Sequence, residues 1–174
     1  MTRIINEYAG KVPNLHLSVA ASGTDSDIEV RLIDEKDFNA ALRAAFGHKV
    51  ASTFIRRTNP QCMTSVKSDA GGAIVRAVSF IIVDKGDDVF RDCAYHELLH
   101  AFGLSNHDQS NPWTTLNQKR VVGYLSAYDR ALLTLLYDPR IRPGMTRAKL
   151  RAVLPEVIDR LGLATPASSR LPTR

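Results

Sequence analysis

The chain has 174 residues, of which 44% are hydrophobic and 24% are charged. This length and composition predict one globular domain and exclude a disordered or fibrous protein. No apolar run approaches the ~20 residues that a membrane helix needs, so we expect no transmembrane segment. The net charge is +5, but residues 139–174 alone hold eight basic and two acidic side chains. Because this excess is confined to one end of the chain, we expect no nucleic-acid binding.

The first half of the chain predicts short elements of both kinds. Residues 2–10 fit an amphipathic helix. Alternating apolar residues predict strands over 14–20 and 27–34, whereas the spacing over 35–46 is helical and Gly47 is a suitable end. A short strand is expected over 52–55.

The longest strand signal covers Ala73–Val83, which we expect to be an edge strand that an extended peptide could join. A helix should follow from Val89 to about Phe102, capped by Asp87 or Asp88 and ended by Gly103.

The segment 105–122 is polar and irregular, and a loop of this length in a compact domain is usually functional or disordered. Helices are expected over 126–137 and 146–161, capped by Ser126 and Thr146. We expect 164–174 to be a disordered tail. The fold class is therefore α+β, with a single domain over 1–163.

One segment, HELLHAFGLSNHD at 96–108, carries recognisable chemistry. His96 and His100 lie one turn apart on a predicted helix, so both imidazoles can bind one metal ion. Glu97 stands beside them without being a ligand. With zinc as the cofactor, Glu97 is expected to act as general base on a zinc-bound water.

A catalytic zinc site needs a third protein ligand. Gly103 is suited to a positive φ and can turn the chain back toward the ion. His107 is the first candidate for the third ligand, followed by Asp108, and Asn106 is a poorer one.

Other interpretations of these residues stay open. Cys93 lies on the same helical face as His96 and His100, so with Cys62 it could complete a closed Cys₂His₂ structural zinc site. The two cysteines could instead be free thiols in a cytosolic protein or one disulfide in an exported one. The histidines could also be structural, without any metal.

The motif resembles the zinc signature of the metzincin metallopeptidases, HExxHxxGxx followed by His or Asp. More specifically, the chain resembles the bacterial family DUF2927, and this resemblance implies a zinc metallopeptidase of a kind that is usually exported or lipid-anchored. The matching pieces are Cys62, residues 71–74, Cys93, residues 97–108, residues 128–130 and residues 136–145.

This resemblance implies a metzincin-like zincin domain: a twisted mixed sheet, an active-site helix and a small helical C-terminal subdomain. The upper part would cover about 1–104 and the lower part about 105–163. It also implies a Cys62–Cys93 disulfide and export, although the chain shows no signal peptide. Two features depart from the metzincin pattern. The metzincin spacing puts the third ligand at Asn106, and no methionine lies between His107 and Tyr137.

We therefore expect a zinc-dependent metalloendopeptidase that acts on a peptide or protein as a monomer. His96, His100 and His107 would bind the ion, and Tyr124 or Tyr128 would help to stabilise the oxyanion. The alternative is a non-catalytic, zinc-stabilised binding module of the cell envelope.

Overall fold

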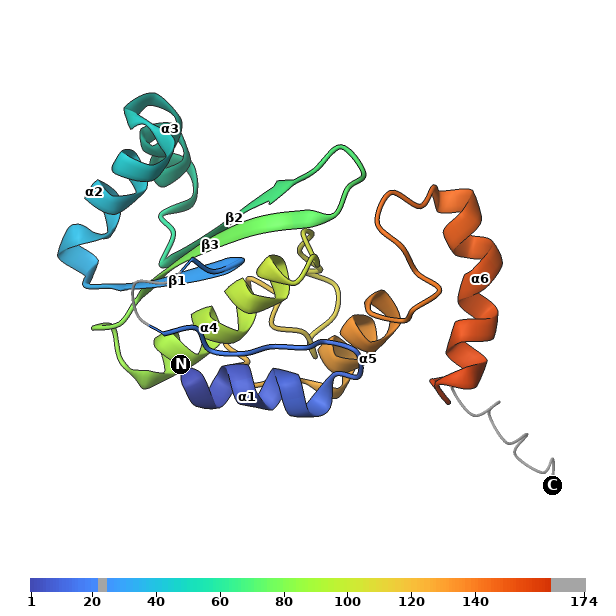
Figure 1. The fold of residues 1–174 in the computed structure, drawn as a ribbon. Coiled ribbons are helices and arrows are strands. Elements are labelled where there is room, and N and C mark those ends of the chain that lie inside the picture. Colours follow the sequence, from blue (N-terminus) through green and yellow to red (C-terminus); the bar gives the residue numbers. More distant parts are fainter. Residues whose placement is uncertain (22–24, 164–174) are drawn as a thin grey trace, which may run out of the picture.

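A computed structural model describes residues 1–21 and 25–163. These residues form an α+β fold of six helices and three strands (Figure 1). The helices are α1 (Thr2–Lys11), α2 (Glu35–Phe46), α3 (His48–Thr58), α4 (Asp87–Ala101), α5 (Ala127–Leu136) and α6 (Arg147–Arg160). The strands are β1 (Ile28–Ile33), β2 (Cys62–Ser68) and β3 (Ile74–Ile82). The expected tail, 164–174, lies outside the described residues.

The strands form one mixed sheet in the order β1-β3-β2, with β1 parallel and β2 antiparallel to β3. The expectation that 73–83 forms an edge strand is therefore wrong. Phe80, Ile81 and Ile82 are all buried, so both faces of β3 are covered, as is usual for a central strand. The edge next to the candidate site is β2, which the sequence analysis did not predict.

Two apolar clusters lie on opposite faces of the sheet. On one face, α4 packs with α1 behind it, and Tyr8, Leu98 and Leu99 are at the centre of this cluster. On the other face, α2 and α3 pack over the sheet through Phe38, Leu42 and Phe80 (Figure 1). The sheet thus holds α4 in a fixed position beneath it.

Two predicted strands are wrong. Asn14 lies in a turn with φ +63°, and residues 15–20 belong to no strand of the described part of the chain, although Leu15 is buried in the cluster around α1 and α4. Residues 52–55 belong to α3, because burial of Ala51 and packing of Ile55 four residues later favour a helix over the local β propensity.

The other predicted elements are confirmed, with one difference in capping. Ser126 and Thr146 cap α5 and α6 by accepting hydrogen bonds from the Asp129 and Lys149 N–H groups. Helix α4 instead begins after Gly86, without a side-chain cap. None of the helices in the described ranges has the length and apolar character needed to cross a bilayer.

The turn between β2 and β3 touches the loop between α5 and α6. Gly144 has φ +72°, and a Cβ placed on it would lie 2.5 Å from the carbonyl oxygen of Gly71. This contact joins the C-terminal part of the chain to the tip of the β2–β3 hairpin (Figure 1).

Gly144→Ala is expected to lower the free energy of unfolding by about 2–4 kcal/mol, from left-handed strain and the backbone clash together. Gly162→Ala is the matched control, because Gly162 has φ +63° but no atom of the described residues lies within 4 Å of a Cβ built there. It should cost only about 1–2 kcal/mol. Urea unfolding of both variants measures the difference, and equal losses would contradict a tight contact at Gly144.

Candidate metal centre

The structure brings three of the predicted site residues together. His96 and His100 project from α4, and His107 reaches them from the loop that follows. Their Nε2 atoms are separated by 3.0 Å (His96 to His100), 3.1 Å (His96 to His107) and 3.2 Å (His100 to His107). Ligand atoms about 2.0–2.1 Å from a tetrahedral zinc ion lie about 3.3–3.4 Å apart, so this triangle fits such an ion closely.

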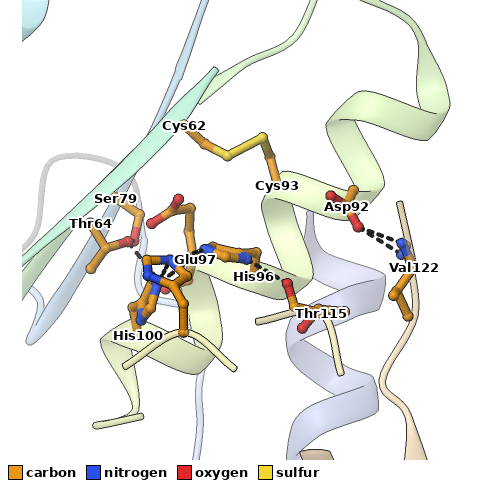
Figure 2. Close-up of a disulfide and its surroundings, with 12 residues drawn as sticks. Cys62, Thr64, Ser79, Asp92, Cys93, His96, Glu97, His100, Thr115 and Val122 are labelled. Carbon is orange, nitrogen blue, oxygen red and sulfur yellow. Dashed lines mark hydrogen bonds between the residues drawn. A yellow bond between two sulfur atoms is a disulfide. The ribbon is translucent and has the colours of Figure 1, made fainter. Parts of the chain in front are cut away.

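Backbone carbonyls determine which nitrogen faces the centre. The His96 Nδ1–H donates to the Thr115 carbonyl at 2.6 Å, and the His100 Nδ1–H donates to the Leu104 carbonyl at 2.6 Å. Figure 2 shows the contact between His96 and Thr115. In a neutral imidazole this arrangement leaves Nε2 as an acceptor. Acceptors this close repel one another, and a cation between them removes the repulsion.

The end of α4 explains how His107 arrives. Gly103 has φ +111°, and the Leu104 N–H donates back to the Leu99 carbonyl at 3.0 Å. This turn reverses the chain after the helix. A Cβ at Gly103 would lie 3.3 Å from the Leu136 side chain, so α5 packs directly against the turn.

The histidines are held in the state that a metal ion requires. Burial lowers the pKa of His100 to about 4, with a further lowering from the neighbouring His96. Burial also lowers the pKa of His96 and, less enclosed, of His107. At neutral pH all three are therefore neutral imidazoles, as metal binding requires.

Glu97 lies beside the histidines and is only 3% exposed. Burial raises its pKa to about 8. Its Oε2 has no hydrogen-bond partner among the described residues. Thr64 on β2 holds the backbone here, because its hydroxyl donates to the Glu97 carbonyl at 3.1 Å and also contacts the buried Ser79 hydroxyl (Figure 2). A buried carboxylate oxygen without a partner is costly unless a charge or a ligand compensates.

The cysteines form the disulfide that the resemblance implied, Cys62–Cys93 (Figure 2). It joins the edge strand β2 to α4, three residues before His96. Because both sulfur atoms are in this bond, the alternative of a Cys₂His₂ zinc site is wrong for this structure.

The remaining predicted residues lie outside the cluster. The Asp108 carboxylate accepts hydrogen bonds from the Ser110 N–H and hydroxyl, within its own loop. Tyr124 and Tyr128 are 49% and 39% exposed and do not line the cavity that contains the histidines. Their role in stabilising an oxyanion stays a prediction.

The cavity has a volume of about 920 Å³ and opens to solvent. His96, Glu97, His100 and His107 form part of its wall, and the rest comes from Asp92 and Cys93 of α4, from β2, from the end of α3 with the connection to β2, and from the loop after α4. The candidate ligands and the buried carboxylate are thus reachable by a ligand the size of a short peptide segment.

The sequence did not predict the groups that orient the His96 ring through its Nδ1 atom. Thr115 provides the carbonyl, and the fully buried Asp129 on α5 holds Thr115 in place. The Asp129 carboxylate accepts from the Thr115 N–H at 3.1 Å, from the Ser126 hydroxyl at 2.9 Å and from the Thr114 hydroxyl. The only sequence signal near this contact is the helix predicted to begin at Ser126, after the polar, irregular segment 105–122.

Fold and site together define an α+β domain with a cluster of three histidines beside a buried glutamate. The sequence model described as "Protein of unknown function (DUF2927)" matches residues 2–156, and the chain belongs to this family. No curated protein matches the chain, and neither does any solved structure.

Proposed function

We propose that this protein is a zinc-dependent metallopeptidase. The observation that carries the proposal is the convergence of the Nε2 atoms of three neutral imidazoles beside Glu97, whose buried Oε2 has no partner among the described residues. A closed structural zinc site would have four protein ligands, whereas this cluster offers three and opens into a cavity.

His96, His100 and His107 would hold the ion, and Glu97 is near enough to the cluster to act without being a ligand. When bound, zinc lowers the pKa of water and polarises a carbonyl group. Glu97 would accept the proton of the attacking water and return it to the leaving amine. In the metal-free protein burial raises the pKa of Glu97 to about 8, and a bound cation would lower it, which favours the carboxylate that accepts the proton.

Strand β2 is the element that can hold an extended peptide. The Ile82 N–H donates to the Gln61 carbonyl at 3.2 Å. In an antiparallel pair the bonded residues alternate, so the N–H and C=O groups of Cys62, Thr64 and Val66 point away from β3. These groups face the free edge of the described sheet, next to Glu97, and can pair with the backbone of a substrate.

The disulfide supports an exported protein, because such bonds persist in oxidising compartments. We propose a location in the periplasm, the cell envelope or the extracellular space.

Metal content by elemental mass spectrometry tests the metal site first. We expect one zinc ion per chain in the wild type, and loss of zinc in His100→Ala and His107→Ala. His16→Ala is the control, because His16 is exposed and lies outside the cluster. No zinc in the wild type after reconstitution would contradict the proposal.

Glu97→Gln tests catalysis separately. It should retain zinc but lose about 10²- to 10⁴-fold in the rate of hydrolysis of a peptide library, because the proton acceptor is removed. If the wild type binds zinc but cleaves no peptide faster than Glu97→Gln does, the protein is a non-catalytic zinc module instead.

A further inference from the structure

One aromatic side chain of α3 faces the cavity rather than a hydrophobic core. Ala51 and Ile55 pack in the cluster over the sheet. Phe54 lies about 100° around the helix from Ile55 and packs in neither apolar cluster of the described residues. It is half-buried and lines the cavity that contains the histidines. Core packing therefore does not account for a large apolar residue at this position.

The connection from α3 to β2 completes an apolar wall. Asn59 ends α3 in the left-handed conformation, with φ +43°, and turns the chain toward the sheet. Pro60 and Met63 then line the same cavity as Phe54, and Met63 also packs against the apolar cluster over the sheet. We call these three side chains, Phe54, Pro60 and Met63, the α3 wall.

The α3 wall lies within reach of a peptide held at β2. Met63 is next to Thr64, whose hydroxyl contacts the Glu97 backbone. Since a strand rises about 3.3 Å per residue, a peptide paired with β2 passes from Glu97 to the α3 wall within about two residues. Backbone groups of Cys62 and Thr64 face the free edge along this path.

The charges in the cavity favour an uncharged side chain at the α3 wall. The cavity lining contains no lysine or arginine among the described residues. Its carboxylates are Glu97, at the histidines, and Asp92, which accepts hydrogen bonds from the Val122 and Gly123 N–H groups at 2.7 and 3.1 Å (Figure 2). An acidic side chain therefore meets no lysine or arginine in the lining that the described residues form, and the apolar side chains of the α3 wall offer no partner for a charge.

We propose that the α3 wall is a specificity subsite that binds a bulky apolar side chain of an extended peptide. That side chain lies about two residues from the peptide bond placed at the histidines. This inference rests on the proposed function for the position of that bond, and it adds the class of substrate: an unstructured segment with a large apolar residue on the α3 side.

Binding of peptides to full-length Glu97→Gln protein tests the subsite without relying on turnover. The probes are Ala–Thr decapeptides in which one position at a time is Leu, Phe, Asp or Lys. At one position we expect Leu and Phe peptides to bind about 10- to 100-fold more tightly than the Asp peptide. Phe54→Ser, made in the same background, should reduce this preference to less than about 3-fold. Phe54→Glu should make Lys the preferred residue there.

Trp113→Ser is the matched control, because Trp113 is 67% exposed and lies outside the cavity. It should leave the preference unchanged, and circular dichroism checks that every variant is folded. A preference for Leu that survives in both Phe54 variants would overturn the subsite, as would the absence of any positional preference.

Zinc content and wild-type cleavage of the same peptides separate this inference from the proposed function. Zinc binding and cleavage without an effect of Phe54 would refute only the α3 wall. A Phe54-dependent preference in a protein without zinc or cleavage would refute the metallopeptidase and retain a peptide-binding subsite.

Discussion

In the metal-free protein, Glu97→Gln is expected to become increasingly stabilising relative to the wild type as the pH rises from 5 to 8. Burial raises the pKa of Glu97 from its ordinary value of 4.5 to about 8. The folded protein therefore favours the protonated carboxyl. The contribution of the protonated Glu97 to the free energy of unfolding is fully present below pH 4.5, the pKa in the unfolded chain. It is lost as the pH rises through about 8, the pKa in the folded protein. The loss amounts to roughly 4–5 kcal/mol, and glutamine does not incur it.

Chemical unfolding in the presence of a chelator, at several pH values, measures this difference. Any constant cost of the glutamine amide cancels, because only the change with pH is compared. Glu7→Gln is the control. Hydrogen bonds from Lys11 and Tyr95 outweigh burial and lower the pKa of Glu7, so its contribution is lost only as the pH falls below the unfolded value. A flat difference between Glu97→Gln and the wild type would contradict a buried, unpaired carboxyl.

Adding zinc should remove much of this pH dependence. A nearby cation favours the ionised carboxylate, so it lowers the pKa of Glu97 and opposes the effect of burial. Without metal, the histidines give the stability of the folded protein the opposite dependence on pH. Since the folded pKa of His100 is lowered to about 4, its contribution is present above the unfolded value near 6.5 and is lost as the pH falls.

The sequence predicted the core of the site because its geometry is local. Two histidines four residues apart on a helix must share a face, and a glycine after the helix permits the turn that returns His107. The number of residues in that turn departs from the metzincin spacing, yet the three Nε2 atoms still converge. The choice between His107 and Asp108 could not be made from spacing alone. It depends on the hydrogen bonds between Asp108 and Ser110.

The sequence predicted the edge of the sheet poorly. Strand β2 contains Thr64, Ser65, Lys67 and Ser68, so it lacks the alternation of apolar residues that marks a half-buried strand. Its position is set by pairing with β3 and by the disulfide at Cys62. Conversely, Thr53, Phe54 and Ile55 have high strand propensity but lie in a helix, because tertiary packing decides between the two.

The hydrogen bond that orients His96 could not be predicted from the sequence, because its acceptor is a backbone carbonyl and every residue type provides one. Thr115 contacts His96 only because α5 brings Asp129 against the loop. Thr115 and Thr114, which donate hydrogen bonds to Asp129, lie 14 and 15 residues before it in the chain, and no local sequence pattern links them to it.

Asp129→Asn is expected to weaken zinc binding by about 10- to 100-fold. This effect would be indirect, because Asp129 makes no hydrogen bond to the three histidines and does not line the cavity. Its carboxylate holds the Thr115 N–H, and the Thr115 carbonyl fixes the His96 ring with Nε2 toward the centre. An asparagine amide presents an NH₂ group where the carboxylate accepted hydrogen bonds. Donors left without an acceptor in this buried position should also lower the free energy of unfolding by about 3–5 kcal/mol.

Asp138→Asn is the control that separates ligand positioning from general destabilisation. Asp138 is also buried and lies just beyond the other end of α5, where it pairs with Arg140 and Arg160. Its loss should lower stability without changing zinc affinity. Competition with a chromophoric chelator, under conditions where all proteins are folded, measures the affinities. Equal affinities in the two variants would mean that Asp129 stabilises the fold alone. A selective loss in Asp129→Asn would show that the contact through Thr115 prepares His96 for the metal.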